Sequence, residues 1–265
     1  MEVAHVINFP YLRQTMRSNL RLWLPFTLIS CVFLIVMCNV FTPTNISTLG
    51  DMADGSFAGN LLSGGTLIAF MSNSYYALMA ILFPMLYSIL AGNGLIAAKV
   101  DNGSMAGYLA TPVSRTRIVC SSALYLIGSL AAMWIVISLV GIAAAQIAQP
   151  GELDFALFLR LNLGAFLYHF AISSICFFAS CLFDSSSTSL LVGGGIPLLF
   201  FVISLLVKLS DSLEVLKYFT LNTLFDTAAI LQGEGYGADF TVLAVVGILF
   251  YTAGILLFRK RDLPL

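Results

Sequence analysis

Charged residues are scarce in this chain. Asp, Glu, Lys and Arg make up only 9% of its 265 residues, whereas 59% are hydrophobic and the mean hydropathy is +0.97. Soluble domains usually carry about 25% charged residues. The formal net charge of −1 gives no indication of a nucleic-acid partner. The composition therefore excludes an ordinary soluble domain and predicts an all-α integral membrane protein.

Sequence signatures of catalysis and of nucleotide or metal binding are also missing. The chain has no GxxxxGK[ST] phosphate loop, no HExxH and no nucleophile elbow, and no pair of buried carboxylates suits acid–base catalysis. Its five Cys residues have no CxxC spacing and no His partner nearby. We therefore expect no bound cofactor or metal and no enzyme activity, so that energy for any transport comes from another subunit.

Apolar runs long enough to cross a bilayer occur six times. A helix needs about 20 apolar residues to span a hydrocarbon core of roughly 30 Å. The pattern predicts one transmembrane domain, residues 1–265, with six transmembrane helices. They lie near Trp23–Phe41, Tyr75–Ala98, Ile118–Ile147, Leu161–Phe183, Ser189–Leu209 and Phe240–Phe258.

Positive charge is concentrated in one set of connecting segments. Lys and Arg in short loops stay on the cytoplasmic side of a membrane. Nine of the twelve fall before the first span, after the second span or in the carboxyl-terminal tail. We therefore expect a multi-pass cell-membrane protein with both termini in the cytoplasm. The nine are Arg13, Arg17, Arg21, Lys99, Arg115, Arg117, Arg259, Lys260 and Arg261.

The segment before the first span has a helical pattern of its own. Over residues 9–22, apolar side chains recur every three or four positions and three arginines share another face. This predicts an amphipathic helix that lies in the cytoplasmic interface against the lipid bilayer. Its role stays open between a lipid anchor and part of a docking surface for a cytoplasmic subunit. The apolar residues are Phe9, Leu12, Met16, Leu20 and Trp23, and the arginines are Arg13, Arg17 and Arg21.

A polar tract, residues 94–117, separates the second span from the third. Asp101, Asn102 and Gly103 favour a turn, and Ser104 is placed to cap a helix that follows it. That helix should end before Pro112, because the residue preceding a proline avoids the helical region. The tract therefore predicts a short helix within a cytoplasmic loop over residues 99–117.

The short helix in the polar tract has an apolar face. Met105, Tyr108 and Leu109 lie at spacings of three and four residues. We expect this face to be open to a cytoplasmic partner, and the alternative is an ordinary interfacial loop. After the helix, Arg115 and Arg117 start the third span and anchor it at the headgroups.

Three residues inside the predicted spans suggest special roles. Pro84 and Pro197 should bend their helices, either for close packing or to line a translocation route. His169 is a titratable group in mid-membrane, either bonded to a neighbouring helix or part of a pathway. A further alternative is an intramembrane hydrolase, in which His169 pairs with Ser173 four residues later.

The run GLIAAKVDNGSMAGYLATPVSRTRIV, which begins at Gly94, resembles a loop of bacterial ABC transporter permeases of the type-2 (ABC-2 type) exporter family. Lys99 stands where that family commonly has an acidic residue, and Ala110 where it often has a second apolar residue. The closing FRKRDLPL, from Phe258, is similar to the basic ending of these permeases. The matching positions of the loop are Gly94, Ile96, Ala97, Asp101, Gly103, Ser104, Leu109, Thr111, Pro112, Ser114 and Arg115.

The resemblance implies a half-transporter. Two such permease chains, identical or of sister type, would bind separate cytoplasmic ABC ATPase subunits that hold ATP and Mg. The cargo would be an amphipathic or hydrophobic peptide or drug-like molecule moved outward, as in resistance to antimicrobial peptides or drugs; a non-transporting immunity or assembly subunit is the alternative. The loop over residues 99–117 would couple the two subunits through Lys99, Asp101, Gly103, Ser104, Met105, Tyr108, Leu109 and Arg115.

Overall fold

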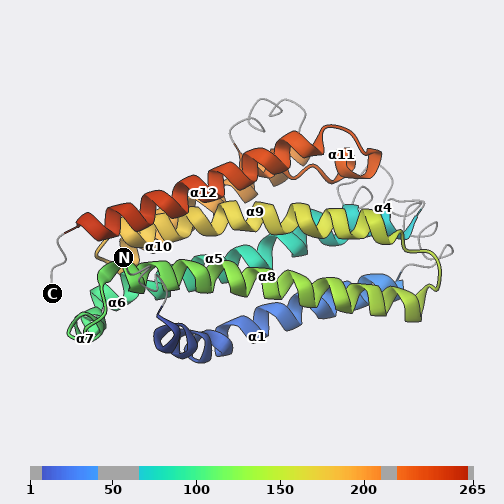
Figure 1. Cartoon of the computed structure of the whole chain (residues 1–265). Helices are drawn as coiled ribbons and strands as arrows, with labels where there is room; N and C mark the ends of the chain where they lie inside the picture. Colours follow the sequence, from blue (N-terminus) through green and yellow to red (C-terminus); the bar gives the residue numbers. More distant parts are fainter. Residues whose placement is uncertain (1–7, 41–65, 210–219, 262–265) are drawn as a thin grey trace, which may run out of the picture.

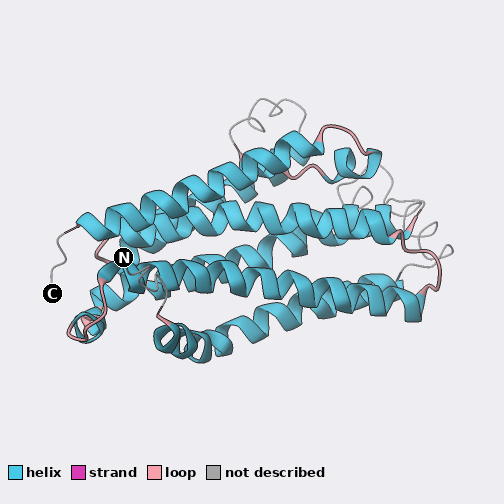
Figure 2. Cartoon of the chain, in the orientation of Figure 1, coloured by secondary structure: helices cyan, strands magenta, loops and turns pink. Residues whose placement is uncertain are grey.

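The computed structural model describes residues 8–40, 66–209 and 220–261, which form a bundle of long helices without a strand (Figures 1 and 2). Six helices in these ranges are long and apolar enough to cross a membrane. They confirm the predicted all-α membrane fold. The spans are α1 (Phe9–Val40); the run of α4 (Leu67–Ser74), η1 (Tyr75–Met79), α5 (Ala80–Leu95) and α6 (Ala97–Asp101); α8 (Arg115–Ala148); α9 (Phe155–Leu182); α10 (Ser186–Leu209); and α12 (Tyr236–Lys260).

Three short elements connect the spans at the two ends of the bundle. The helix α7 (Ser104–Leu109) follows α6, and the 3-10 helix η3 (Leu221–Leu224) and α11 (Thr227–Gln232) precede α12. Figure 1 shows α6 and α7 at the end where α1 begins and α12 ends, whereas α4 and α11 lie at the opposite end. The polar tract therefore lies at the end that carries most of the positive charge.

The central helix of the bundle is α9. It packs against α5, α8, α10 and α12, and Phe158, Tyr168 and Phe177 on it are fully buried. From Gly164 to Cys181 nearly every residue is buried or half-buried, whereas Leu159 and Leu163 near its start are about half exposed. By contrast, α1 packs mainly on α8 at the edge and leaves Leu28 and Val32 more than half exposed. Apolar side chains exposed in this way suit contact with lipid.

The amino-terminal amphipathic segment is continuous with the first span. Residues 9–22 are helical, as predicted, but they are the first turns of α1 and not a separate helix. Figure 1 shows these turns, in the darkest blue, running at a steep angle to the rest of α1. Pro25 lies inside α1 and removes the backbone bond to the carbonyl of Arg21. The proline accounts for a bend without a break.

The second span starts earlier than its hydropathy indicated. The prediction placed its first residue at Tyr75, but the helix begins at Leu67, where the Thr66 hydroxyl accepts a bond from the backbone N–H of Ala69. The prediction was wrong because Ser72 and Ser74 resemble loop residues in sequence yet are buried against the bundle. Of the predicted outer segment 42–74, residues 42–65 lie outside the described ranges.

Pro197 lies inside α10, four residues after a close contact with α9. Proline has no N–H to donate to the residue four positions earlier, and the thiol of Cys176 on α9 donates to that carbonyl, Gly193 O, at 3.1 Å. A Cβ on Gly193 would lie 2.9 Å from Ala179 Cβ, and one on Gly194 would lie 2.7 Å from Ile89 Cγ2. The close-packing interpretation therefore has a structural basis, and a translocation route stays a prediction.

Gly193→Ala is expected to lower the free energy of unfolding by about 1 kcal/mol, because the new methyl group overpacks the α9–α10 contact. The matched control is Gly195→Ala on the same helix, where a Cβ meets nothing within 4 Å and the gain in helix propensity is stabilising. Thermal unfolding of the purified variants measures the difference. Equal melting temperatures for the two variants would show that the contact between α9 and α10 accommodates an extra methyl group without loss of stability.

Candidate functional site

The polar tract begins with a break in the second span. Ile96 separates α5 from α6 and has a non-helical backbone, so nearby N–H groups lose their partners within the helix. Ser180 on α9 bridges the break. Its hydroxyl accepts from Ala97 N at 2.8 Å and donates to Asn93 O at 3.4 Å. The central helix α9 therefore holds the start of the tract directly.

The turn before α7 is built around Gly103. Its φ of +73° places it in the left-handed region that favours glycine, and it is the residue before the first turn of α7. The predicted cap, Ser104, is instead the first helical residue. The backbone N–H of Ser104 donates to Asn102 Oδ1 at 3.0 Å, and the Ser104 hydroxyl donates to Lys99 O at 3.4 Å. The left-handed backbone brings the Asn102 side chain to this N–H, so Asn102 and Gly103 do the capping.

Lys99 joins the tract to the first helix. Its Nζ donates to Tyr11 Oη at 2.9 Å and lies 4.9 and 5.2 Å from the ring centroids of Tyr11 and Tyr108. The two rings meet edge to face with centroids 5.4 Å apart. Tyr11 Oη is also bonded to Ser122 Oγ of α8 at 2.9 Å. A cation between two aromatic rings is stabilised by both, which gives Lys99 a local reason to occupy a position where an acid is common in the resembling permeases.

The apolar face of α7 points into the protein. Met105 is fully buried, and Tyr108 and Leu109 are half-buried. The expectation of an open face was therefore wrong for Met105, which packs on the rest of the chain, whereas contact of Tyr108 and Leu109 with a partner stays a prediction. The side that remains exposed carries small residues, namely Ser104, Ala106, Gly107 and Ala110.

Asp101 connects the tract to the fifth span. Its Oδ2 accepts from the backbone N–H of Ser186, the first residue of α10, at 3.1 Å. Asn93 Nδ2 donates to Ser186 Oγ at 2.7 Å. A carboxylate at a helix amino terminus satisfies a free N–H and interacts favourably with the helix dipole. A displacement of α6 would therefore move the start of α10 through the hydrogen bond between Asp101 and Ser186.

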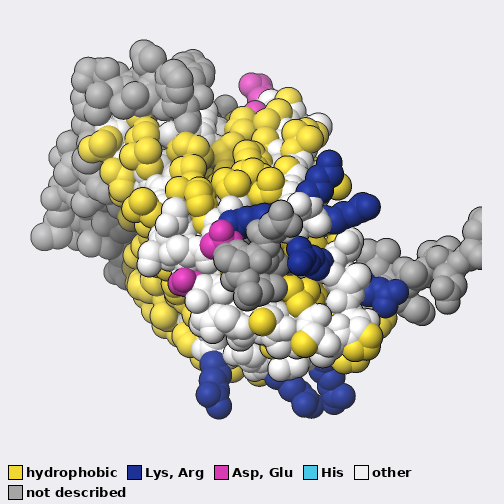
Figure 3. All heavy atoms as spheres, turned by 90° about the vertical axis from the view of Figure 1, so that its left-hand side faces the viewer, with side chains coloured by type: hydrophobic (Ala, Val, Ile, Leu, Met, Phe, Trp, Pro, Cys, Tyr) yellow, Lys and Arg dark blue, Asp and Glu magenta, His cyan; other side chains and the backbone are white. Residues whose placement is uncertain are grey.

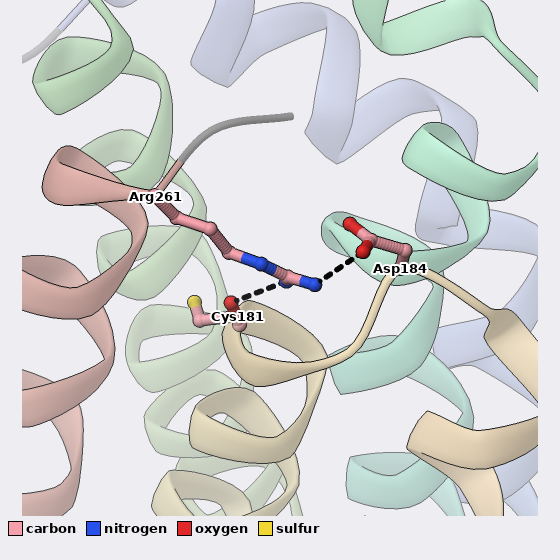
Figure 4. A network of polar contacts seen from close by, with 3 residues as sticks. All are labelled: Cys181, Asp184 and Arg261. Atoms are coloured by element: carbon pink, nitrogen blue, oxygen red, sulfur yellow. Dashed lines mark hydrogen bonds and ion pairs between the residues drawn. The ribbon is translucent and has the colours of Figure 1, made fainter. Parts of the chain in front are cut away.

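The carboxyl-terminal end of α12 is fixed by a second network (Figure 4). Arg261 donates to Cys181 O at 3.0 Å and pairs with Asp184 Oδ2 at 2.6 Å. Its own carbonyl accepts from Arg115 Nη1 at 2.9 Å. This network joins α8, α9 and α12. The distribution of Lys and Arg in the sequence predicted that Arg115 and Arg261 lie at the same end of the bundle. The ion pair between Arg261 and Asp184 is visible only in the folded structure, which brings these two residues together.

The arginines of the first helix lie apart from these networks. Arg13, Arg17 and Arg21 are exposed. Within the described ranges the one ion pair is that of Arg261 with Asp184. Figure 3 shows Lys and Arg side chains spread over this end of the bundle, with few Asp or Glu among them. The predicted concentration of positive charge is therefore present in space as well as in sequence.

His169 is buried in the middle of the bundle. Its Nε2 lies 3.0 Å from Ile81 O on α5 and its Nδ1 lies 2.6 Å from Ala165 O. Ile81 is three residues before Pro84, whose ring disturbs the local helix bonds. Ser173, the expected partner in a hydrolase, is bonded to Tyr251 Oη and Phe170 O instead. The geometry supports the bonded structural role and does not form the His–Ser pair that catalysis requires.

Comparison with known proteins identifies one family. The family model described as "ABC-2 family transporter protein" matches residues 12–263. This stretch contains the whole polar tract and the network of Arg261 at the end of α12. No curated protein sequence matches the chain.

Proposed function

Because the chain belongs to the ABC-2 transporter family, we propose that it is the membrane-spanning permease subunit of an ATP-binding cassette exporter whose ATP and Mg are bound by separate cytoplasmic ATPase subunits. The family confirms the resemblance found in residues 94–117 and makes the chain a multi-pass membrane transporter component. The observation that carries the rest of the proposal is α7, a helix with one exposed side whose tract is bonded to several spans, in a chain without a phosphate loop.

The proposed contact with the ATPase is the exposed side of α7. Ala106, Gly107 and Ala110 leave the backbone accessible, and small residues allow another helix or loop to approach closely. The coupling role predicted for Met105 and Tyr108 becomes indirect in this proposal. They would fix α7 to the bundle, so that a push on its outer side moves the bundle with it.

Force would leave α7 by three routes. Lys99 and Tyr108 contact Tyr11 of α1, Asp101 accepts a bond from the first residue of α10, and the backbone N–H of Ala97 donates to Ser180 of α9. A displacement of the tract would therefore turn several spans together. Such motion is a rigid-body change of the hinge-and-shear kind, in which packed helices move as units.

The remaining partners follow from the family and from the surface. We propose a second permease chain, identical or of sister type, and an amphipathic or hydrophobic cargo carried outward. Apolar side chains that stay exposed along α10 and α12, such as Leu191, Leu199 and Leu249, support contact with lipid, cargo or the second chain. In this proposal the end rich in Lys and Arg faces the cytoplasm of a bacterial cell, because cytoplasmic loops carry an excess of these residues.

Ala106→Glu is the test of this function. A charge on the exposed side of α7 is expected to reduce co-purification of a tagged ATPase subunit by about tenfold or more, since burying an unpaired charge in an interface is strongly unfavourable. Folding should be unchanged. The control is Ala238→Glu, an exposed position at the other end of the bundle. Equal recovery of the ATPase with both variants would refute the assigned contact.

A further inference from the structure

A groove runs between the first turns of α1 and the first half of α8. It encloses about 390 Å³, and its walls are almost wholly apolar. Met16, Leu20 and Leu124 in its walls are 55%, 49% and 41% exposed, so nothing in the described ranges covers them. Residues of both helices line it, among them Leu12, Met16 and Leu20 of α1 and Leu124, Gly128 and Ala132 of α8.

The polar atoms in the walls of the groove already have partners. Trp23 Nε1 donates to Ser129 O at 2.9 Å and joins the two helices. Ser129 Oγ donates to Leu126 O and accepts from Tyr87 Oη. The groove therefore offers no hydrogen bond to an occupant, and it suits a hydrocarbon chain.

Uncompensated positive charge flanks the groove. Arg13 lies three residues before Met16 and Arg17 three before Leu20, a spacing that puts each arginine beside a groove residue on the helix. Arg13 and Arg17 also line a second hollow on α1, with Phe9, Pro10 and Gln14. Neither α1 nor α8 contains an Asp or Glu. An anion that balances these charges must therefore come from outside the two helices.

We propose that this groove binds an anionic phospholipid, with one acyl chain between α1 and α8 and the phosphate at Arg13 and Arg17. The two halves of the ligand match two adjoining features of the surface. An apolar molecule would leave the arginines without a counter-charge, and a free phosphate would leave the groove empty. The proposal goes beyond a helix that rests in the interface, because it names a site for an individual lipid.

The site can be blocked without touching its charges. A Cβ on Gly128 meets nothing within 4 Å, so Gly128→Leu fills the groove with a side chain that the fold can hold. Gly195→Leu is the matched control, because Gly195 lies on α10 and has the same free space. Arg13→Gln with Arg17→Gln removes the charge and keeps polar side chains. Its control is Arg259→Gln with Lys260→Gln, which are exposed cations at the same end on α12.

Lipid retention measures binding. The full chain, with any subunits that purify with it, is equilibrated in an equal mixture of phosphatidylglycerol and phosphatidylcholine, and lipids bound after transfer to detergent are counted by native mass spectrometry. Each cation near an anionic lipid contributes a factor of about five, so the two arginines should give the wild type a preference of about 25-fold for phosphatidylglycerol. The arginine pair should lose the preference, Gly128→Leu should lose the bound lipid, and both controls should resemble the wild type.

Tryptophan quenching places the lipid in the groove. The chain has two Trp residues, and Trp134→Phe leaves Trp23, which lines the groove. Chain-brominated phosphatidylglycerol should quench Trp23 more strongly than brominated phosphatidylcholine, and Gly128→Leu should abolish the difference. Loss of preference in the arginine pair with no effect of Gly128→Leu would mean surface attraction only and would overturn the site. Equal retention of the two lipids by the wild type would overturn it as well.

Discussion

Met105→Glu is expected to prevent the chain from accumulating in folded form. Met105 is a residue of α7, and its side chain is fully buried on the side of the helix that faces the bundle. A carboxylate placed there has no cation to pair with in α7, because none of the six residues of α7 is charged. Burial of an unpaired charge costs about 3–5 kcal/mol, a large part of the total stability of a protein. Yield of monodisperse protein after extraction from membranes measures the effect.

The comparison of Met105→Glu with Ala106→Glu separates two views of α7. If the apolar side of α7 faced a partner, the Met105→Glu variant would fold normally and lose only its binding of the ATPase. With the side chain buried, the Met105 variant should be unstable even without the ATPase, whereas the Ala106 variant should be stable. Met105→Leu is the control, since an apolar side chain of similar volume is tolerated in a core. Normal yield of Met105→Glu would contradict the packing of α7.

The six spans could be predicted because their signal is local. A bilayer requires about 20 apolar residues in each span, and the chain has six such runs. The boundaries were less predictable: Ser72 and Ser74 are polar, yet they are buried because a helix satisfies its own backbone and can carry small hydroxyl side chains into a packed interior. Hydropathy measures the side chains and not the contacts that shield them.

The direction of the amphipathic face in the polar tract could not be predicted. A spacing of three and four residues shows that Met105, Tyr108 and Leu109 share a side, but the same pattern arises whether that side meets another chain or its own. Tyr11 decides the matter here, because it packs on Tyr108 and binds Lys99 from 88 residues away in sequence. Contacts between positions so distant leave no trace in the local pattern of the tract.

The network at the end of α12 shows the same limit. The arginines were assigned to one side of the membrane from their number alone. Their separate roles depend on the fold: Arg261 closes a network with Asp184 and the end of α9, whereas Arg259 on the preceding turn is exposed. A matched pair of charge reversals can therefore distinguish bulk positive charge from a particular contact.

Arg261→Glu is expected to lower the free energy of unfolding by about 2–4 kcal/mol. The change places a negative charge beside Asp184 and removes the donor to Cys181 O in the last turn of α9. An exposed ion pair alone contributes at most about 1 kcal/mol, so most of the loss comes from repulsion and from the uncapped carbonyl. Thermal unfolding in detergent measures it, and Arg259→Glu, with the same change in net charge, should stay within about 0.5 kcal/mol of the wild type.

The double variant Asp184→Arg with Arg261→Glu tests whether the contact itself matters. Exchange of the two charges restores an attractive pair in place of the repulsion, although the bond to Cys181 O stays lost. Recovery should therefore be partial: the double variant should be more stable than Arg261→Glu, and its loss of stability should be smaller than the sum of the losses of the two single variants. If the double variant is no more stable than Arg261→Glu, the ion pair with Asp184 does not stabilise the fold, and the contribution of Arg261 comes from its bond to Cys181 O.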